Sequence, residues 1–161
     1  GITRTTLYLY FKYKREIFIW SIKQLTDSVE KDLRGMIDEA GVPWATRLES
    51  VLHTIVDRCA DNRRLFNVVL TYLLQAQKSG KDPDSRVKRR TIRLRHLMSQ
   101  LMIAGRNAGE FKIPNVKIAN ELLYGLVESA IYRIAILDRS EAEDVKAAMS
   151  FAISQMTTTS G

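Results

Sequence analysis

Apolar residues recur every three or four positions along almost the whole chain. Each of the three prolines follows a glycine closely, in "GVP", "GKDP" and "GEFKIP", and these short stretches separate the periodic segments. A spacing of three to four matches the turn of an α-helix, and no stretch shows the two-residue alternation of a strand. The pattern therefore predicts an all-α protein.

The chain opens with "GITRTTLYLYFKYKREIF". We expect Thr3 to be the N-cap of a short helix from Arg4 to about Phe11, because a threonine hydroxyl can accept a bond from a free amide of the first turn. The segment "KYK" is then expected to break the helix. A long helix follows from about Lys14 to Glu39, and one apolar stripe runs along it: Phe18, Ile22, Leu25, Val29, Leu33 and Met36.

Four signals place the remaining helices. Pro43 suits the start of the second helix, Gly80 suits the end of the third, and Asp84 or Ser85 suits the start of the fourth, which reaches about Asn107. A fifth helix is expected over about 116–137. For the last helix, over about 141–156, Ser140 and Glu143 have the spacing of a capping box.

The composition is that of a globular chain, with 161 residues, a single cysteine and a formal charge of +7. No apolar run approaches the ~20 residues of a membrane span, so we expect a cytoplasmic protein with no membrane partner. The excess of Lys and Arg favours a polyanionic partner, although a merely basic surface would give the same charge.

The opening residues resemble part of a known protein family. A turn of Gly, a hydrophobic residue and Thr, then "LYLYF", a lysine and "EIF", resembles the end of the helix-turn-helix in TetR-type transcriptional repressors. The match lies at Gly1, Thr3, Leu7, Tyr8, Tyr10, Phe11, Lys14, Glu16 and Phe18. The later stretch "AGRNAGEFKIPNVKIANELLYGLVESAI" is similar to the loop and first dimerisation helix of that family.

This resemblance implies that the chain has two parts with different functions. Residues 1–13 would be the end of a DNA-binding domain whose first two helices precede Gly1, and residues 14–161 a helical regulatory domain with dimerisation helices over 116–157. Arg4, Thr5 and Thr6 would meet base edges or nearby phosphates, and Tyr8, Tyr10 and Lys14 backbone phosphates. Leu7 and Phe11 would face inward. Tyr10 could alternatively pack against the preceding helices.

The regulatory domain of such a protein holds a ligand cavity, expected here among the helices between 14 and 107 and closed by the helix after 116. Aromatic and Met side chains suit apolar ligands, although a stripe of them is more often plain core. The candidate lining residues are Trp20, Leu52, Ile55, Val56, Phe66, Val69, Tyr72, Leu73, Met98, Leu101, Met102 and Leu123. Polar candidates are His53, Tyr72, Tyr124 and Glu128.

The last two helices carry apolar faces that include small residues, which permit close helix approach. These faces predict a homodimer built as a four-helix bundle, two helices from each subunit. The expected interface residues are Ile118, Leu122, Gly125, Leu126, Ser129, Val145, Ala148, Met149, Ala152 and Met156.

No catalytic or metal motif is evident, and we expect neither an enzyme nor a cofactor: His53 and His96 lack ligand spacing, and no nucleophile has an identifiable base. The basic run "SRVKRRTIRLR" is expected to be a solvated face, with an anionic contact as the alternative. The sequence predicts a DNA-binding repressor released by an apolar or amphipathic small molecule. The alternative is a helical dimer that binds small molecules or proteins without DNA.

Overall fold

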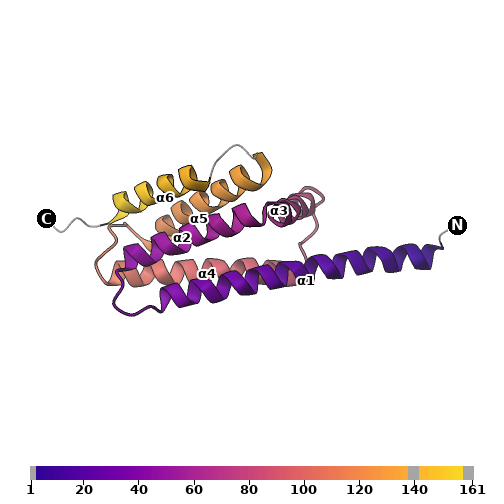
Figure 1. Cartoon of the computed structure of the whole chain (residues 1–161), viewed down its shortest axis with the longest axis horizontal. Coiled ribbons are helices and arrows are strands. Elements are labelled where there is room, and N and C mark those ends of the chain that lie inside the picture. Colours follow the sequence, from indigo (N-terminus) through magenta and orange to yellow (C-terminus); the bar gives the residue numbers. More distant parts are fainter. Residues whose placement is uncertain (1–2, 138–141, 158–161) are drawn as a thin grey trace.

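The computed structural model describes residues 3–137 and 142–157, which form a bundle of helices (Figure 1). The helices are α1 (Arg4–Ile37), α2 (Trp44–Asp61), α3 (Arg63–Lys78), α4 (Ser85–Asn107), α5 (Val116–Tyr132), the π-helix η1 (Arg133–Leu137) and α6 (Ala142–Met156). The described residues contain no strand, only an isolated bridge between Phe111 and Thr157. The all-α prediction is therefore confirmed.

α1 is a single helix of 34 residues. Thr3 caps it as predicted, because its hydroxyl accepts a bond from the amide of Thr6 at 3.2 Å. The predicted break at residues 12–14 is wrong, and so is the separate short helix before it. Neither glycine nor proline lies between residues 4 and 34, and Lys and Tyr cost a helix little, so nothing local stops the helix.

The other helix ends follow the sequence closely. Pro43 is the N-cap of α2 rather than its first residue, and the side chain of Asp84 caps α4. Gly80, after α3, has a φ of 68°, which glycine adopts without steric cost. The expected cap at Ser140 lies outside the described residues.

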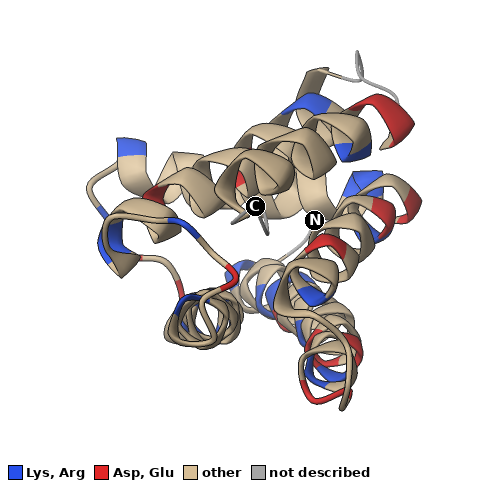
Figure 2. Ribbon diagram, turned by 90° about the vertical axis from the view of Figure 1, so that its left-hand side faces the viewer, with Lys and Arg blue, Asp and Glu red and all other residues tan. Residues whose placement is uncertain are grey.

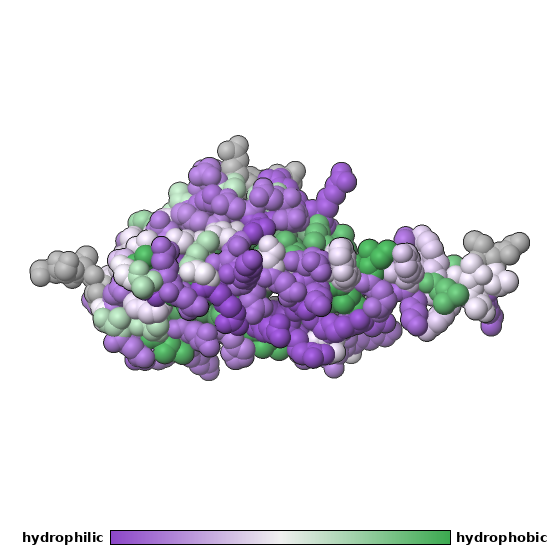
Figure 3. All heavy atoms as spheres, turned by 60° about the horizontal axis from the view of Figure 1, so that its bottom comes forward, coloured by the Kyte–Doolittle hydropathy of each residue, from purple (hydrophilic) through white to green (hydrophobic). Residues whose placement is uncertain are grey.

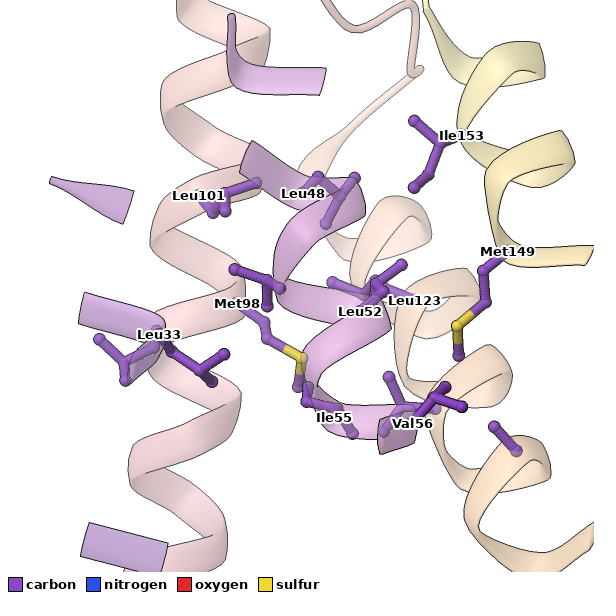
Figure 4. Packing of buried hydrophobic residues seen from close by; sticks show 14 of the residues in the cluster. Leu33, Leu48, Leu52, Ile55, Val56, Met98, Leu101, Leu123, Met149 and Ile153 are labelled. Atoms are coloured by element: carbon purple, nitrogen blue, oxygen red, sulfur yellow. The ribbon is translucent and has the colours of Figure 1, made fainter. Parts of the chain in front are cut away.

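The main core lies where α2 meets the surrounding helices (Figure 4). Leu33 of α1, Leu48 and Leu52 of α2, Leu101 of α4 and Leu123 of α5 are fully buried there. A smaller cluster holds Ile19, Ile22 and Val87, with Phe18, Val69, Tyr72 and Leu73 packed against it. The predicted stripe of α1 thus supplies both clusters.

α3 differs from the other α-helices because none of its 16 residues is buried. Figure 1 shows it nearly end-on, crossing the direction of α1 and α4. Its inner side chains are only partly covered: Phe66 and Leu70 touch the main core, whereas Val69 and Leu73 touch the smaller cluster. Asn67 also donates a side-chain bond to the carbonyl of Ala135 in η1, at 3.1 Å.

The loop between α4 and α5 is held closely against its neighbours. The amide of Lys112 donates to the carbonyl of Met156 at 2.6 Å, next to the Phe111–Thr157 bridge. The ring of Phe111 lies directly over Gly105, where an added Cβ would come within 2.1 Å of a ring carbon. Phe111 is itself buried. This packing joins the end of α4 to the end of α6.

Candidate functional site

The amino-terminal half of α1, residues 4–17, is exposed at every position. It extends beyond the rest of the bundle (Figure 1), and hydrophobic and hydrophilic side chains mix on its surface (Figure 3). We call this segment the projecting segment. Its basic residues are Arg4, Lys12, Lys14 and Arg15, and its exposed aromatic residues are Tyr8, Tyr10, Phe11 and Tyr13. A surface of this kind offers cations for phosphates and rings for stacking.

Contacts within the projecting segment connect its rings and charges. The ammonium of Lys14 lies 4.8 Å from the centre of the Tyr10 ring, and the ring of Phe11 meets that of Tyr10 edge-on at 5.7 Å. Leu7 and Phe11, which are expected to face inward, are exposed in the part of the chain that the structure describes, where no helix packs on this half of α1.

Helix geometry divides the candidate DNA-contacting residues into two groups. At 3.6 residues per turn, Arg4 and Tyr8 share one face of α1. Thr6, Tyr10 and Lys14 share a nearly opposite face, and Thr5 lies between the two. The continuous helix therefore brings the predicted residues together as the two flanks of one rod rather than as one flat surface.

Ion pairs connect α1 to α4 and to the loop before α4. Arg15 pairs with Asp84 at 2.9 Å, Glu16 with Arg86 at 3.0 Å, and Asp27 with Arg90. We call this set the α1–α4 ladder, with a looser contact between Glu30 and Arg93 at 3.8 Å. Figure 2 colours the acidic and basic positions of these helices. The basic run of α4 was expected to be solvated, but several of its arginines are paired within the chain.

Asp84 is the central acceptor of the ladder. Its carboxylate accepts from the amide and guanidinium of Arg86 and from Arg15, and these bonds hold its pKa well below the usual range. The bond from Arg86 likewise lowers the pKa of Glu16. The backbone amide of Asp84 donates to the hydroxyl of Tyr72 at 2.8 Å. This arrangement fixes the α3–α4 loop against the base of the projecting segment.

The predicted cavity residues are placed in three ways. Seven are buried in the main core: Leu52, Ile55, Val56, Met98, Leu101, Met102 and Leu123. Phe66, Val69, Tyr72 and Leu73 are half-buried around the inner side of α3. Trp20 is 62% exposed, so its assignment to the interior is wrong. The stripe of α1 passes through Ile19 and Ile22 instead and leaves Trp20 facing solvent.

The polar candidates mainly connect helices. The hydroxyl of Tyr124 shares a bond of 2.7 Å with Ser99 and donates to the carbonyl of Arg95, and Glu128 pairs with the guanidinium of Arg95. His53 is half-buried, and its Nε2 lies 3.0 Å from the hydroxyl of Ser150. These contacts join α4 to α5 and α2 to α6.

The expected dimer face is exposed on α5 but not on all of α6. Ile118, Leu122, Gly125 and Ser129 are exposed and follow the three- and four-residue spacing of one face, which Tyr132 continues. On α6, Met149 and Met156 are buried in the chain's own core, so their assignment to an outer face is wrong. Leu126, Val145 and Ala152 are half-buried, while Ala148 is exposed.

Other chemistry is limited among the described residues. There, no group of three His, Cys, Asp or Glu side chains is placed to hold a metal ion. Cys59 is buried, and burial raises its pKa to about 11, so the thiol stays protonated and unreactive near neutral pH. Within the part of the chain that the structure describes, no helix has the length and apolar character needed to cross a membrane.

Sequence reasoning missed the α1–α4 ladder. A signal was present, because the helix after residue 14 carries carboxylates at Glu16, Asp27 and Glu30, and the basic run offers arginines that could pair with them. The partners lie more than 60 residues apart, however, and only the fold brings them together.

Compared with known proteins, the chain matches no family model, no curated protein and no solved structure.

Proposed function

We propose that the protein is a dimeric DNA-binding transcription regulator whose DNA contacts include the amino-terminal end of α1. The observation that carries this proposal is the projecting segment, where basic and aromatic side chains cover an exposed helix held at its base by the α1–α4 ladder. A formal charge of +7 agrees with a polyanionic partner. The resemblance of the first eighteen residues to TetR-type repressors points to the same function.

The shape of the projecting segment suits a groove. B-DNA's major groove admits one α-helix, and a helix inside it has a wall of phosphates on either side. The two groups of candidate residues, Arg4 with Tyr8 and Thr6 with Tyr10 and Lys14, lie on opposite flanks of α1. Both flanks can therefore contact the backbone while the amino-terminal turn approaches base edges.

The α5 face supplies the dimer part of the proposal. Its apolar residues Ile118, Leu122 and Tyr132 are between 46% and 51% exposed, and Gly125 and Ser129 between them allow another helix to approach closely. A second copy of the chain has the same face, as a two-fold dimer requires. Two copies of the projecting segment could then enter successive major grooves about 34–36 Å apart.

The proposal includes control of DNA binding by a small molecule that binds beneath α3. Because no residue of α3 is buried, its inner apolar side chains have less packing to lose than those of the other helices. An apolar or amphipathic small molecule inserted beneath Val69 and Leu73, which touch the smaller cluster, would bind without opening the main core. Tyr72 and Asp84 connect this region to the base of the projecting segment. Ligand and DNA would oppose each other by the same factor.

The DNA part is tested by salt titration of duplex binding. Lys14→Ala should weaken binding to a mixed-sequence duplex and reduce the slope of log affinity against log salt by about 1. The matched control is Lys23→Ala, which removes an exposed lysine from the packed half of α1 and should change neither quantity. If both variants bind like the unmodified chain over the whole salt range, the assignment of Lys14 is wrong.

The dimer part is tested by sedimentation. Gly125→Trp should raise the monomer fraction, because a bulky side chain separates helices that meet at a glycine. Lys117→Trp places the same side chain beside the exposed face and should leave the mass unchanged. An unchanged dimer mass for Gly125→Trp would exclude this interface.

A second function is favoured by the apolar residues of the projecting segment. Leu7, Leu9, Phe11 and Ile17 are between 46% and 60% exposed, a feature of surfaces that bind other proteins. On this view the chain is a helical dimer that acts without DNA. This function would be favoured if Lys14→Ala left the duplex affinity and its salt dependence unchanged. A stable protein complex that is lost on Phe11→Ala would support it further.

A further inference from the structure

A polar hollow of about 200 Å³ lies between the first turns of α2 and the last turns of α6. It is far from the projecting segment, at the opposite end of the bundle (Figure 1). Its lining residues are Ala45, Thr46, Glu49, Ser150, Ile153, Ser154 and Thr157. Three hydroxyls from α6 and its end and one hydroxyl and one carboxylate from α2 therefore face a common space.

Two of the hydroxyl protons on the α6 side are already donated to backbone carbonyls. Ser154 donates to the carbonyl of Phe151 at 2.6 Å, and Thr157 donates to that of Ile153 at 2.8 Å. Ser150 shares its bond with the ring of His53. A hydroxyl that has donated its proton still has lone pairs, so the oxygens of Ser154 and Thr157 can only accept further bonds. The hollow consequently offers acceptors and few donors.

Glu49 gives this hollow a negative charge. Its side chain is half-buried and forms no ion pair with any residue that the structure describes. Cations elsewhere on α2 and α6 have other acceptors: the guanidinium of Arg47 bonds to the carbonyls of Val42 and Ile37, and Lys146 pairs with Asp57 and Glu143.

The two helix ends beside the hollow have opposite electrostatic effects on a bound cation. The carboxyl end of α6 favours a cation, whereas the amino end of α2 disfavours one. The carboxylate of Glu110 accepts from the amide of Trp44 at 2.9 Å and offsets the positive end of α2. The local field is therefore set mainly by Glu49 and the oxygen lone pairs.

We infer that this hollow binds the primary ammonium group of a small organic amine. An ammonium has three donors and no acceptor, which complements one carboxylate and several hydroxyl oxygens. The volume is below the ~300–1,000 Å³ of pockets that enclose a drug-sized molecule, so the hollow suits a short amine or the amine end of a longer one. This inference is independent of DNA binding and of the proposed ligand site under α3.

The test is an NMR titration of the isotopically labelled chain with n-butylammonium chloride. We expect saturable amide shifts confined to residues 45–49 and 150–157, with a dissociation constant on the order of 1 mM for so small a ligand. n-Butanol has the same chain without the charge, and tetramethylammonium has the charge without N–H donors. Both should bind at least about tenfold more weakly.

Variants assign the binding to the hollow. Glu49→Gln keeps the size of the side chain and removes its charge, so it should weaken butylammonium binding about tenfold. Glu121→Gln removes an exposed carboxylate from α5 and should have no effect. If Glu49→Gln does not fold, Ser154→Ala removes an acceptor at an exposed position and should weaken binding several-fold.

Three results would overturn the inference. One is equal binding of butylammonium and butanol, which would show an apolar contact only. Another is equal binding of tetramethylammonium, which would show a diffuse counterion. The third is an unchanged affinity in both Glu49→Gln and Ser154→Ala, which would place the amine elsewhere.

Discussion

Residues 4–17 and residues 18–37 belong to the same helix but occupy opposite environments. The first half is exposed on all sides and contacts the bundle through the ion pairs of Arg15 and Glu16. The second half buries Ile19, Ile22, Val29 and Leu33 against the neighbouring helices. Helix formation therefore has two causes within α1: a cap and favourable local residues in the first half, and tertiary packing in the second.

The sharpest test of this difference exchanges one leucine for alanine in each half. Leu33→Ala should lower the free energy of unfolding by about 2–5 kcal/mol, because Leu33 is fully buried and its removal leaves a cavity. Leu9→Ala should change it by less than about 0.5 kcal/mol, since Leu9 is exposed. Urea unfolding measures both. Equal losses would mean that the projecting segment is packed.

The junction of the two halves should be less sensitive than the core. Asp84→Ala should lower the free energy of unfolding by about 0.5–2 kcal/mol, since it removes the cap of α4 and the partner of Arg15. Asp82→Ala, an exposed change in the same loop, is the matched control and should have little effect. Similar losses in both variants would show that the effect is not specific to Asp84. The role assigned to Asp84 would then be wrong.

Acid should weaken the same junction without any mutation. The folded-state pKa values of Asp84 and Glu16 lie below their ordinary values of 3.8 and 4.5. Their contribution is therefore complete above those ordinary values and is lost as the pH falls through the folded-state values. The urea midpoint should decrease from about pH 5 downward, and less steeply in Asp84→Ala. Identical acid profiles would contradict this assignment.

The smallest effect is expected at an ion pair on the packed half whose arginine is largely exposed and whose glutamate is half-buried. Glu30 and Arg34 lie one turn apart and pair at 3.0 Å, with Arg34 largely exposed. Such pairs stabilise a helix by about 0.3–0.5 kcal/mol. A double-mutant cycle on Glu30→Gln and Arg34→Gln should give a coupling in that range, reduced by salt. A coupling above about 1 kcal/mol would show that the pair is less solvated than the exposure of Arg34 indicates.

The sequence predicted elements whose signals are local. The N-caps Thr3 and Asp84 and the turn at Gly80 depend on a few adjacent residues, and each is confirmed. The continuity of α1 was missed because basic residues and aromatics at 10–14 suggested a boundary. The available signal was that neither glycine nor proline lies between residues 4 and 34, so no residue there stops a helix.

The candidate sites depended on information that the sequence does not contain. Periodicity identifies α6 as amphipathic, yet it does not say whether Met149 and Met156 meet the chain's own core or another copy. The fold shows the former. Similarly, the residue types around Glu49 appear ordinary in sequence, and only the pairing of α2 with α6 brings them to one hollow.

The contact between Phe111 and Gly105 has a consequence for how this chain can vary. A ring within 2.1 Å of the place of a missing Cβ leaves position 105 no freedom while position 111 keeps its phenylalanine. Even alanine at 105 would displace the ring, and with it the loop that contacts the end of α6. A smaller residue at 111 would remove that restriction. Substitutions at these two positions are therefore expected to arise together, so that each is harmful alone and tolerated in the company of the other.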